Sequence, residues 1–185
     1  MKKLLTIVFV FTSTILFSQC PPEGNGRNDK EKSANILKNR NITVKKTVDE
    51  VTLQQILTSG TDFTRFSSDK YIMVEGYVTD FKEGGKESCN CNTDVDSLKD
   101  NHIYIGLSPN STKDECMIVE ITPKFKRLNP KFNLKTIKNK KVQVYGLMFF
   151  DEEHKGSAKN TCKTCEHVWR KTCWEIHPVT KIIVE

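Results

Sequence analysis

The sequence predicts a mainly β fold, a five-stranded and mainly antiparallel barrel with an N-terminal helical extension. Three observations support this prediction. Five apolar segments of strand length follow residue 70, and turn residues separate them. A helical segment lies between the third and the fourth. Gly76 and Gly146 lie inside the first and fourth segments, where a small barrel must bend sharply. This order of elements is that of the OB-like barrel, and a generic antiparallel sandwich is the alternative.

The composition is that of an ordinary globular protein. The 185 residues suffice for one domain, and 29 Lys and Arg residues against 23 Asp and Glu residues give a formal net charge of +6. With 37% hydrophobic and 28% charged residues, the chain is neither collagen-like, nor fully disordered, nor a polytopic membrane protein. No glycine-rich loop suited to cradling phosphate groups is present, so we do not expect a nucleoside triphosphate as ligand.

Residues 1–19 have the pattern of a signal peptide. Lys2 and Lys3 precede an apolar run of about 14 residues, short of the ~20 needed to span a bilayer. A buried N-terminal helix is the alternative, but the run has no polar face. We expect cleavage near Gln19 or Cys20, an exported (periplasmic or secreted) monomer, and no transmembrane span in the mature chain. Lipid anchoring through Cys20 is less favoured, because a bulky Gln before the Cys is unusual for lipoprotein processing.

Residues 20–69 form an N-terminal extension. Short helices are predicted at 29–40 and 48–57, where apolar residues recur at helical spacing. Gly60 follows the second of them as a helix stop.

Residues 70–185 form the barrel domain. The predicted strands are 71–81, 102–107, 116–121, 141–150 and 173–184. We expect the fifth strand to be interrupted at Pro178, because proline cannot donate to a ladder. A helix is predicted at 134–138. The polar loops 82–101 and 151–170 join the first strand to the second and the fourth to the fifth.

Short motifs are spread over most of the mature chain. They are Leu-Lys-Asn-Arg at 37–40, Val-Glu-Gly-Tyr-Val at 74–78, Glu-Ser-Cys-Asn-Cys at 87–91, Val-Glu-Ile-Thr-Pro at 119–123, the segment 146–154, Trp-Arg at 169–170 and Trp-Glu-Ile-His-Pro-Val-Thr at 174–180. In these motifs the chain resembles an uncharacterised family of secreted bacterial OB-fold-like proteins. The resemblance implies a fold and a compartment, and it carries no established activity.

Alternation along the fifth strand places two ionisable residues on one face. Trp174 and Ile176 share one face, and Glu175 and His177 share the other. A Glu and a His side by side can form a hydrogen-bonded pair that raises the imidazole pKa. Such a pair serves as a base or as part of a ligand set. The alternative, which we weight more heavily, is a structural polar network with Trp174 in the core.

The loop after the fourth strand carries further candidates, namely Asp151, His154, Asn160 and Arg170. In an OB-like barrel this loop lies beside the ligand-binding face. Asp151, His154 and His177 would suit a divalent metal, although their spacing matches no sharp metal motif. A solvated acidic turn is the alternative, and it is preferred. Arg170 either clamps an anionic ligand or neutralises Glu175.

The predicted topology brings these groups together. Strand five returns antiparallel beside the end of strand four, so the two ends share one mouth of the barrel. We therefore predict that five side chains converge at that mouth: Asp151, His154, Arg170, Glu175 and His177.

The chain has seven cysteines. Two close pairs, Cys89 with Cys91 and Cys162 with Cys165, lie on the two long loops. In an exported protein they favour disulfides, and structural zinc held by four thiolates is the alternative. A redox centre is disfavoured, because no thioredoxin-like βαβ pattern precedes the Cys-x-x-Cys. We expect at least one disulfide among these four cysteines, and the spacing leaves the pairing open.

The segment 123–141 contains eight Lys and Arg residues and no acid. Phe125 and Phe132 are interleaved with them, as in a nucleic-acid-binding patch. A solvated lysine-rich helix at the base of the barrel is the alternative.

These features favour a secreted or periplasmic OB-like binding module without catalytic activity. Its ligand would be anionic or sugar-like, such as an anionic polymer or an oligosaccharide, with single-stranded nucleic acid as the first candidate. One alternative is a metal-assisted phosphodiesterase that uses Asp151, His154, Glu175 and His177. Another is a structural envelope protein without a small ligand. No cofactor or metal is expected, and structural zinc or a divalent ion is the minority alternative.

Overall fold

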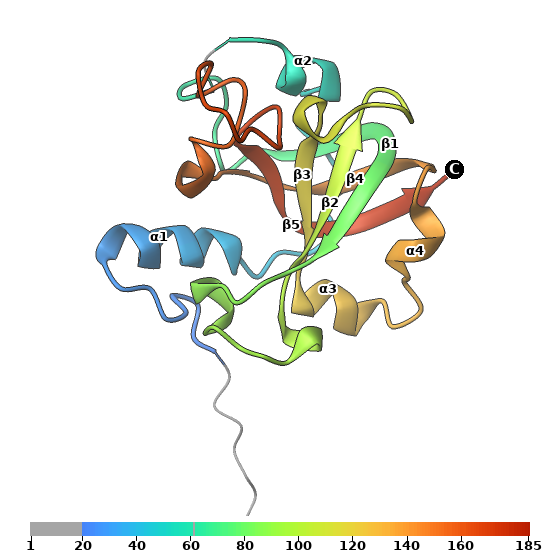
Figure 1. Cartoon of the computed structure of the whole chain (residues 1–185). Coiled ribbons are helices and arrows are strands. Elements are labelled where there is room, and N and C mark those ends of the chain that lie inside the picture. The colour runs from blue at the N-terminus through green and yellow to red at the C-terminus, as the bar shows by residue number, and fades with distance from the viewer. Residues whose placement is uncertain (1–19, 61) are drawn as a thin grey trace, which may run out of the picture.

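The computed structural model describes residues 20–60 and 62–185 as a closed barrel of five strands in the order β1-β2-β3-β5-β4 (Figure 1). The predicted signal peptide, residues 1–19, lies outside the described residues. The strands are β1 (Tyr71–Glu83), β2 (Asn101–Gly106), β3 (Met117–Ile121), β4 (Lys141–Phe150) and β5 (Trp174–Val184). The predicted OB-like fold class is confirmed, and the predicted strand limits differ from the observed ones by one or two residues.

The barrel closes through one parallel pairing. β1 pairs antiparallel with β2 and β4, β2 pairs antiparallel with β3, and β4 with β5. β3 and β5 pair in parallel, with Ile118 opposite Glu175 and Val119 opposite Ile176. The sheet is therefore mainly antiparallel, and β3 and β5 lie side by side at the closure.

β1 is long because it belongs to both sides of the barrel. Its first half pairs with β4 and its second half with β2, and Tyr77 lies opposite both Lys141 and Gly106. Gly76 lies at this bend. A Cβ atom there would be 2.6 Å from Leu53 Cδ2 and 2.8 Å from the Gly106 carbonyl oxygen, so only glycine lets the chain come this close.

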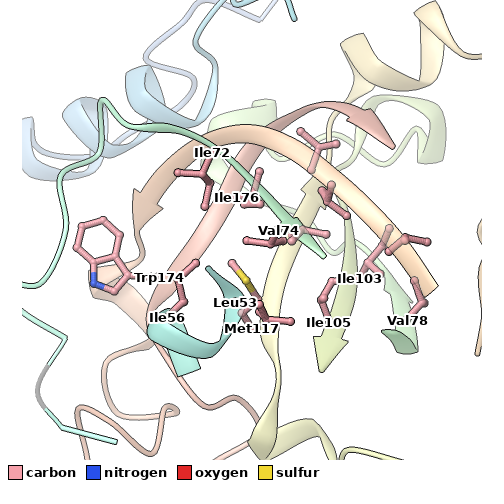
Figure 2. Packing of buried hydrophobic residues seen from close by; sticks show 14 of the residues in the cluster. Leu53, Ile56, Ile72, Val74, Val78, Ile103, Ile105, Met117, Trp174 and Ile176 are labelled. Atoms are coloured by element: carbon pink, nitrogen blue, oxygen red, sulfur yellow. The ribbon is translucent and has the colours of Figure 1, made fainter. Parts of the chain in front are cut away.

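Helix α2 (Leu53–Leu57) closes one end of the barrel. Thr52 caps it, since the Thr52 side chain accepts a hydrogen bond from the Gln55 N–H. Leu53 and Ile56 point into the core, among residues of β1, β2, β3 and β5 (Figure 2). The helix is shorter than predicted, because Asp49 forms a β-bridge with Ile72 instead. This part of the N-terminal extension thus belongs to the barrel core.

Three further helices surround the barrel. α1 (Asp29–Lys38) begins at Asn28, whose side chain accepts from the Glu31 N–H, and it packs against the β1–β2 loop and β5 (Figure 1). α4 (Leu134–Ile137) confirms the predicted helix. α3 (Pro123–Leu128) precedes it and was not predicted, although Thr122 as N-cap and Pro123 in the first turn are a helix-start signal. Short 3₁₀ turns are η1 (Ser88–Asn90), η2 (Asp96–Leu98), η3 (Lys113–Glu115) and η4 (Glu152–His154).

The predicted interruption of the fifth strand is wrong. β5 continues through Pro178 to Val184. Its pairing with β4 shifts register around Gly146, where an added Cβ would lie 2.3 Å from the Pro178 carbonyl oxygen. The close approach of the two backbones at Gly146 lets the strand bend without ending.

Two disulfides link the chain, Cys20–Cys91 and Cys162–Cys165. The prediction of a disulfide among the four loop cysteines is therefore confirmed, and a four-thiolate zinc site is not formed. Cys89, Cys116 and Cys173 are free and buried. The sulfur of Cys20 is bonded to that of Cys91. Among residues 20–60 and 62–185, no helix combines the length and apolarity that a membrane crossing requires.

Candidate functional site

The outer face of β2, β3 and β5 carries a group of neighbouring ionisable side chains. Val119 and Ile176 point into the core, so their neighbours Glu120 and His177 point outward. The outward residues of the three strands are His102, Tyr104, Ile118, Glu120, Glu175 and His177. OB-like barrels use the corresponding face, with its flanking loops, to bind oligonucleotides and oligosaccharides.

In this protein three segments cover that face. Lys38 of α1, Asp100 of the β1–β2 loop and Arg170 of the β4–β5 loop pack against it. Glu175 is 1% exposed and His177 is fully buried. The face that would receive a ligand in an OB-like barrel is therefore packed against the protein's own chain.

The covered side chains form a buried ionic cluster, which we define by its charged members. Its carboxylates are Glu87, Asp100, Glu120, Asp151 and Glu175, its permanent cations are Lys38 and Arg170, and its imidazoles are His102, His154 and His177. Five carboxylates face two permanent cations, so neutral imidazoles would leave an excess of three negative charges. Burial makes such an excess costly, and additional positive charge is needed.

Arg170 organises one end of the cluster. Its Nη1 donates to Asp151 Oδ2 at 2.9 Å, its Nε donates to the Thr172 carbonyl at 2.7 Å, and its Nη2 lies 2.6 Å from Glu175 Oε1. The last pair is close, but it is out of line for a hydrogen bond. His154 Nδ1 meets Asp151 Oδ2 at 2.5 Å. Burial opposes ionisation of Asp151, yet the His154 hydrogen bond and the Arg170 charge hold its pKa far below the usual range.

The residues expected to converge do meet in space. Asp151, His154, Arg170, Glu175 and His177 are joined through contacts of 3.8 Å or less. They do not line an open mouth, because only His154 among them is substantially exposed, with 45% of its side chain accessible. Burial, and after it the negative charges of Glu120 and Asp151, raise the pKa of Glu175, although Arg170 opposes this.

His177 lies at the centre of the other end. Its Nδ1 is 3.0 Å from Glu120 Oε2 and 3.8 Å from Glu175 Oε2, and its Nε2 is 3.4 Å from Asp100 Oδ2. Neither ring nitrogen makes a hydrogen bond, because these oxygens lie off the directions of the ring N–H groups. Burial lowers the pKa of His177, but the Glu120 charge and the contact with Asp100 outweigh it and raise the pKa to about 10.

Two more residues extend the cluster towards solvent. His102 Nε2 lies 3.0 Å from Glu120 Oε1 and 3.5 Å from Glu87 Oε1, and Lys38 Nζ lies 3.3 Å from Glu87 Oε2. Burial opposes protonation of His102, yet the Glu120 charge prevails and raises the pKa to about 11. Sequence reasoning missed five members of the cluster, namely Lys38, Glu87, Asp100, His102 and Glu120. A carboxylate inside the otherwise apolar strand 117–121 was the available signal for Glu120.

Asn160 and Trp174 belong to a different network. The Asn160 side chain donates to Asp62 Oδ1 at 3.1 Å, and Trp174 Nε1 donates to the Asp62 carbonyl at 2.9 Å. Asp62 Oδ2 also accepts from the Thr172 hydroxyl and the Cys173 N–H. Asp62 therefore fastens the segment before β1 to the start of β5, and the two predicted ligand-binding residues have a place in this packing.

An open groove of about 1100 Å³ lies beside the cluster. Its walls are the segments 20–25 and 38–44, the β1–β2 loop, α3 and the middle of β5. Among the residues that the structure describes, four cations line it, namely Lys38, Arg40, Lys124 and Arg127, and no carboxylate does. We call this feature the basic groove.

The cations of the basic groove differ in how many hydrogen bonds they make within the protein. Arg40 donates to the backbone carbonyls of Ser68, Met148 and His177, so it holds the N-terminal segment against the barrel. Lys124 bonds to Asn41 and to the Ile42 carbonyl. Arg127 is exposed and has no hydrogen bond or ion pair within residues 20–60 and 62–185. Arg127 is therefore the cation best placed to receive a ligand.

The basic segment 123–141 does not form a continuous patch. Lys126 donates to the Asp96 and Lys99 carbonyls and to Asn101, and Lys138 pairs with Asp80. Lys141 pairs with Glu75 and Glu185. Phe125 and Phe132 pack edge to face at 5.1 Å and belong to the core packing. Four of the eight basic residues of this segment, Lys124 included, and both of its aromatic rings are thus engaged in contacts within the protein.

Comparison with known proteins gives a remote structural likeness and no family. No protein-family model matches the chain, and no curated protein matches it. Among solved structures, the chain is similar to an aspartyl tRNA synthetase from Entamoeba histolytica, with 11% sequence identity and a TM-score of 0.37. The likeness covers 76% of this chain and 22% of that chain, so this chain spans less than a quarter of the synthetase. At this level of similarity the comparison carries no argument about function.

Proposed function

We propose that this protein is an exported OB-like binding module that holds an anionic ligand in the basic groove. The observation that carries the proposal is the lining of that groove, where four cations occur and no carboxylate. A concave site with one sign of charge concentrates ligands of the opposite sign. The two disulfides support a working place outside the reducing cytoplasm.

The ligand class that we propose is an acidic oligosaccharide. Asn25, Thr43 and Thr180 supply amide and hydroxyl groups along the groove, and Pro21 and Leu128 supply apolar contacts. The one aromatic residue that lines the groove, Phe125, is buried, so no ring is offered for base stacking. Single-stranded nucleic acid, our first candidate from sequence, therefore has less support.

The catalytic alternative has little support from the geometry. Glu175 and His177 are closed to solvent, and Asp151 is engaged by both Arg170 and His154. A phosphodiester would have to displace α1 and both long loops to reach these groups. A binding role in the open groove needs no such rearrangement.

The proposal can be tested by calorimetric titration with oligogalacturonate. We expect binding that weakens as salt is added, because the contact is electrostatic. Arg127→Ala should weaken it about tenfold, the value of one charge-assisted hydrogen-bonded pair. Lys131→Ala is the matched control. It removes a positive charge from the same segment at an exposed residue that does not line the groove, and it should leave the affinity unchanged.

Two outcomes would count against the proposal. An equal loss of affinity in both variants would mean that the ligand responds to the overall positive charge of the segment and does not bind at a site in the groove. Tighter binding of a single-stranded oligonucleotide than of the oligogalacturonate at the same salt concentration would assign the groove to a different ligand class.

A further inference from the structure

In one part of the buried ionic cluster, several nitrogen and oxygen atoms that could bind a metal ion make no hydrogen bond. Asp100, Glu120 and His177 each present one nitrogen or oxygen atom, and these three atoms lie within 4.8 Å of one another. All three residues are at least 97% buried, with exposed fractions of 2%, 3% and 0%. They come from three different elements: the end of the β1–β2 loop, β3 and β5.

Five polar atoms at this point make no hydrogen bond. Both ring nitrogens of His177, Glu120 Oε2, Asp100 Oδ1 and Glu175 Oε2 make no hydrogen bond. Buried polar atoms are nearly always satisfied, and a group of five in one place calls for an explanation. Carboxylate oxygens and an imidazole nitrogen that converge without bonding one another are typical of ligands around a cation.

We propose that Asp100, Glu120 and His177 bind a divalent transition-metal ion such as Zn²⁺, which ties the β1–β2 loop to β3 and β5. Zinc held at about 2.0–2.2 Å by each of its ligands keeps tetrahedral ligand atoms about 3.3–3.6 Å apart. His177 can offer only one of its two ring nitrogens to the ion. Nε2 lies 3.4 Å from Asp100 Oδ2, and one ligand atom of each of the three residues lies within 4.8 Å of the others. The three ligand atoms must therefore close in by up to about 1.5 Å around a tetrahedral ion.

The charges of the surroundings favour a cation here. A divalent ion bound here would take the place of the proton that His177 otherwise holds, and the two carboxylates of Asp100 and Glu120 would offset its charge. One imidazole with two carboxylates suits a borderline ion such as zinc better than calcium or magnesium, which prefer six or more oxygen ligands. Glu175 Oε2, 3.8 Å from His177 Nδ1, is the nearest candidate for a fourth ligand.

The proposed site lies close to the basic groove. Cys89 lines that groove, and its Sγ lies 3.8 Å from Asp100 Oδ2. Glu87, Cys89 and Asp100 form a second set of close ligand atoms, which is partly exposed. Asp100 belongs to both sets, so the experiment must distinguish them.

The test is a zinc titration of the chain with both disulfides intact, after treatment with chelator. We expect one equivalent of Zn²⁺ per chain and a higher melting temperature, because an ion that binds only the folded state stabilises it. His177→Gln should weaken binding by at least about 100-fold, since it replaces an imidazole ligand by a carboxamide. The matched control is His154→Gln, which removes an imidazole from the far end of the same cluster and should bind zinc as the wild type does.

Several results would overturn the proposal. Wild-type protein that is folded and takes up no zinc would do so, as would equal binding by His177→Gln. Loss of zinc in Cys89→Ser but not in His177→Gln would assign the ion to the second set. If His177→Gln does not fold, X-ray absorption at the zinc edge of the wild-type protein decides the question. Imidazole and oxygen scatterers without sulfur support the site, and a sulfur scatterer contradicts it.

Discussion

The guanidinium group of Arg170 lies 2.6 Å from the carboxylate of Glu175, and both side chains are closed to solvent. Arg170 also donates to Asp151 Oδ2 at 2.9 Å, so one cation stands between two buried carboxylates. A buried ion pair repays its desolvation only while both partners are present. This arrangement joins the end of β4, the β4–β5 loop and the start of β5, and it makes Arg170 the residue on which that junction depends.

Replacing Arg170 by Ala should therefore lower the free energy of unfolding by about 3–5 kcal/mol, because two carboxylates lose their buried counter-charge. Arg127→Ala is the control, since it removes an exposed arginine that has no partner in the described part of the chain, and it should change stability by less than about 0.5 kcal/mol. Urea unfolding followed by tryptophan fluorescence measures both. Similar midpoints for the two variants would show that Arg170 is not needed to balance the cluster.

His154 should make stability depend on pH. The hydrogen bond to Asp151 raises its pKa in the folded protein, although burial opposes this. A raised pKa in the folded state means that the stabilisation is complete below the unfolded value of about 6.5 and is lost as pH rises through the folded value. The difference in unfolding free energy between wild type and His154→Gln should thus be largest near pH 6 and shrink at alkaline pH.

The size of this effect should be below about 1 kcal/mol, because 45% of the His154 side chain is exposed and solvent screens the pair. NMR titration of the His154 ring gives an independent check. Its pKa should fall when Asp151 is replaced by Asn. A difference between wild type and His154→Gln that grows with pH would contradict the assignment.

The two disulfides should contribute very unequally. Cys20–Cys91 closes a loop over a sequence separation of 71, whereas Cys162–Cys165 spans 3. The chain-entropy estimate gives about 4 kcal/mol for the long loop and about 1–2 kcal/mol for the short one. Replacing both cysteines of each pair by Ser, one pair at a time, and measuring thermal unfolding should show the larger loss for the first pair. Equal losses would mean that local packing, rather than loop closure, decides.

Much of the barrel could be predicted from sequence because its signals are local. Alternation marked the strands, and Gly76 and Gly146 marked the bends. The errors also have local causes. The predicted helix 48–57 is longer than the observed one because Asp49 pairs with Ile72, a contact that only the tertiary structure provides. The expected break at Pro178 did not account for the freedom that Gly146 gives to the opposing strand.

The candidate site could be predicted only in part. The contacts of Arg170 with Asp151 and Glu175 follow from the antiparallel return of β5, which is a topological argument. The same argument does not predict that α1 and the two long loops cover the outer face of the barrel. Lys38 resembles any solvated helix lysine in sequence, yet it is 6% exposed because α1 packs across the barrel. Which loop and helix lie over a sheet is decided by long-range packing, which hydrophobic periodicity does not encode.

The bend of β1 provides the last prediction. Gly76→Ala would place a Cβ atom 2.6 Å from Leu53 Cδ2, 2.7 Å from Ile105 Cγ2 and 2.8 Å from the Gly106 carbonyl oxygen. The side chains can move, but the carbonyl belongs to the paired strand β2 and cannot withdraw without breaking the ladder. We expect a loss of about 1–3 kcal/mol, typical of an overpacked core. Gly85→Ala adds the same methyl group where no atom lies within 4 Å, so its urea midpoint should equal that of the wild type. Equal midpoints for both variants would show that β1 can bend without a glycine, and the close packing of α2 against the barrel would then need another cause.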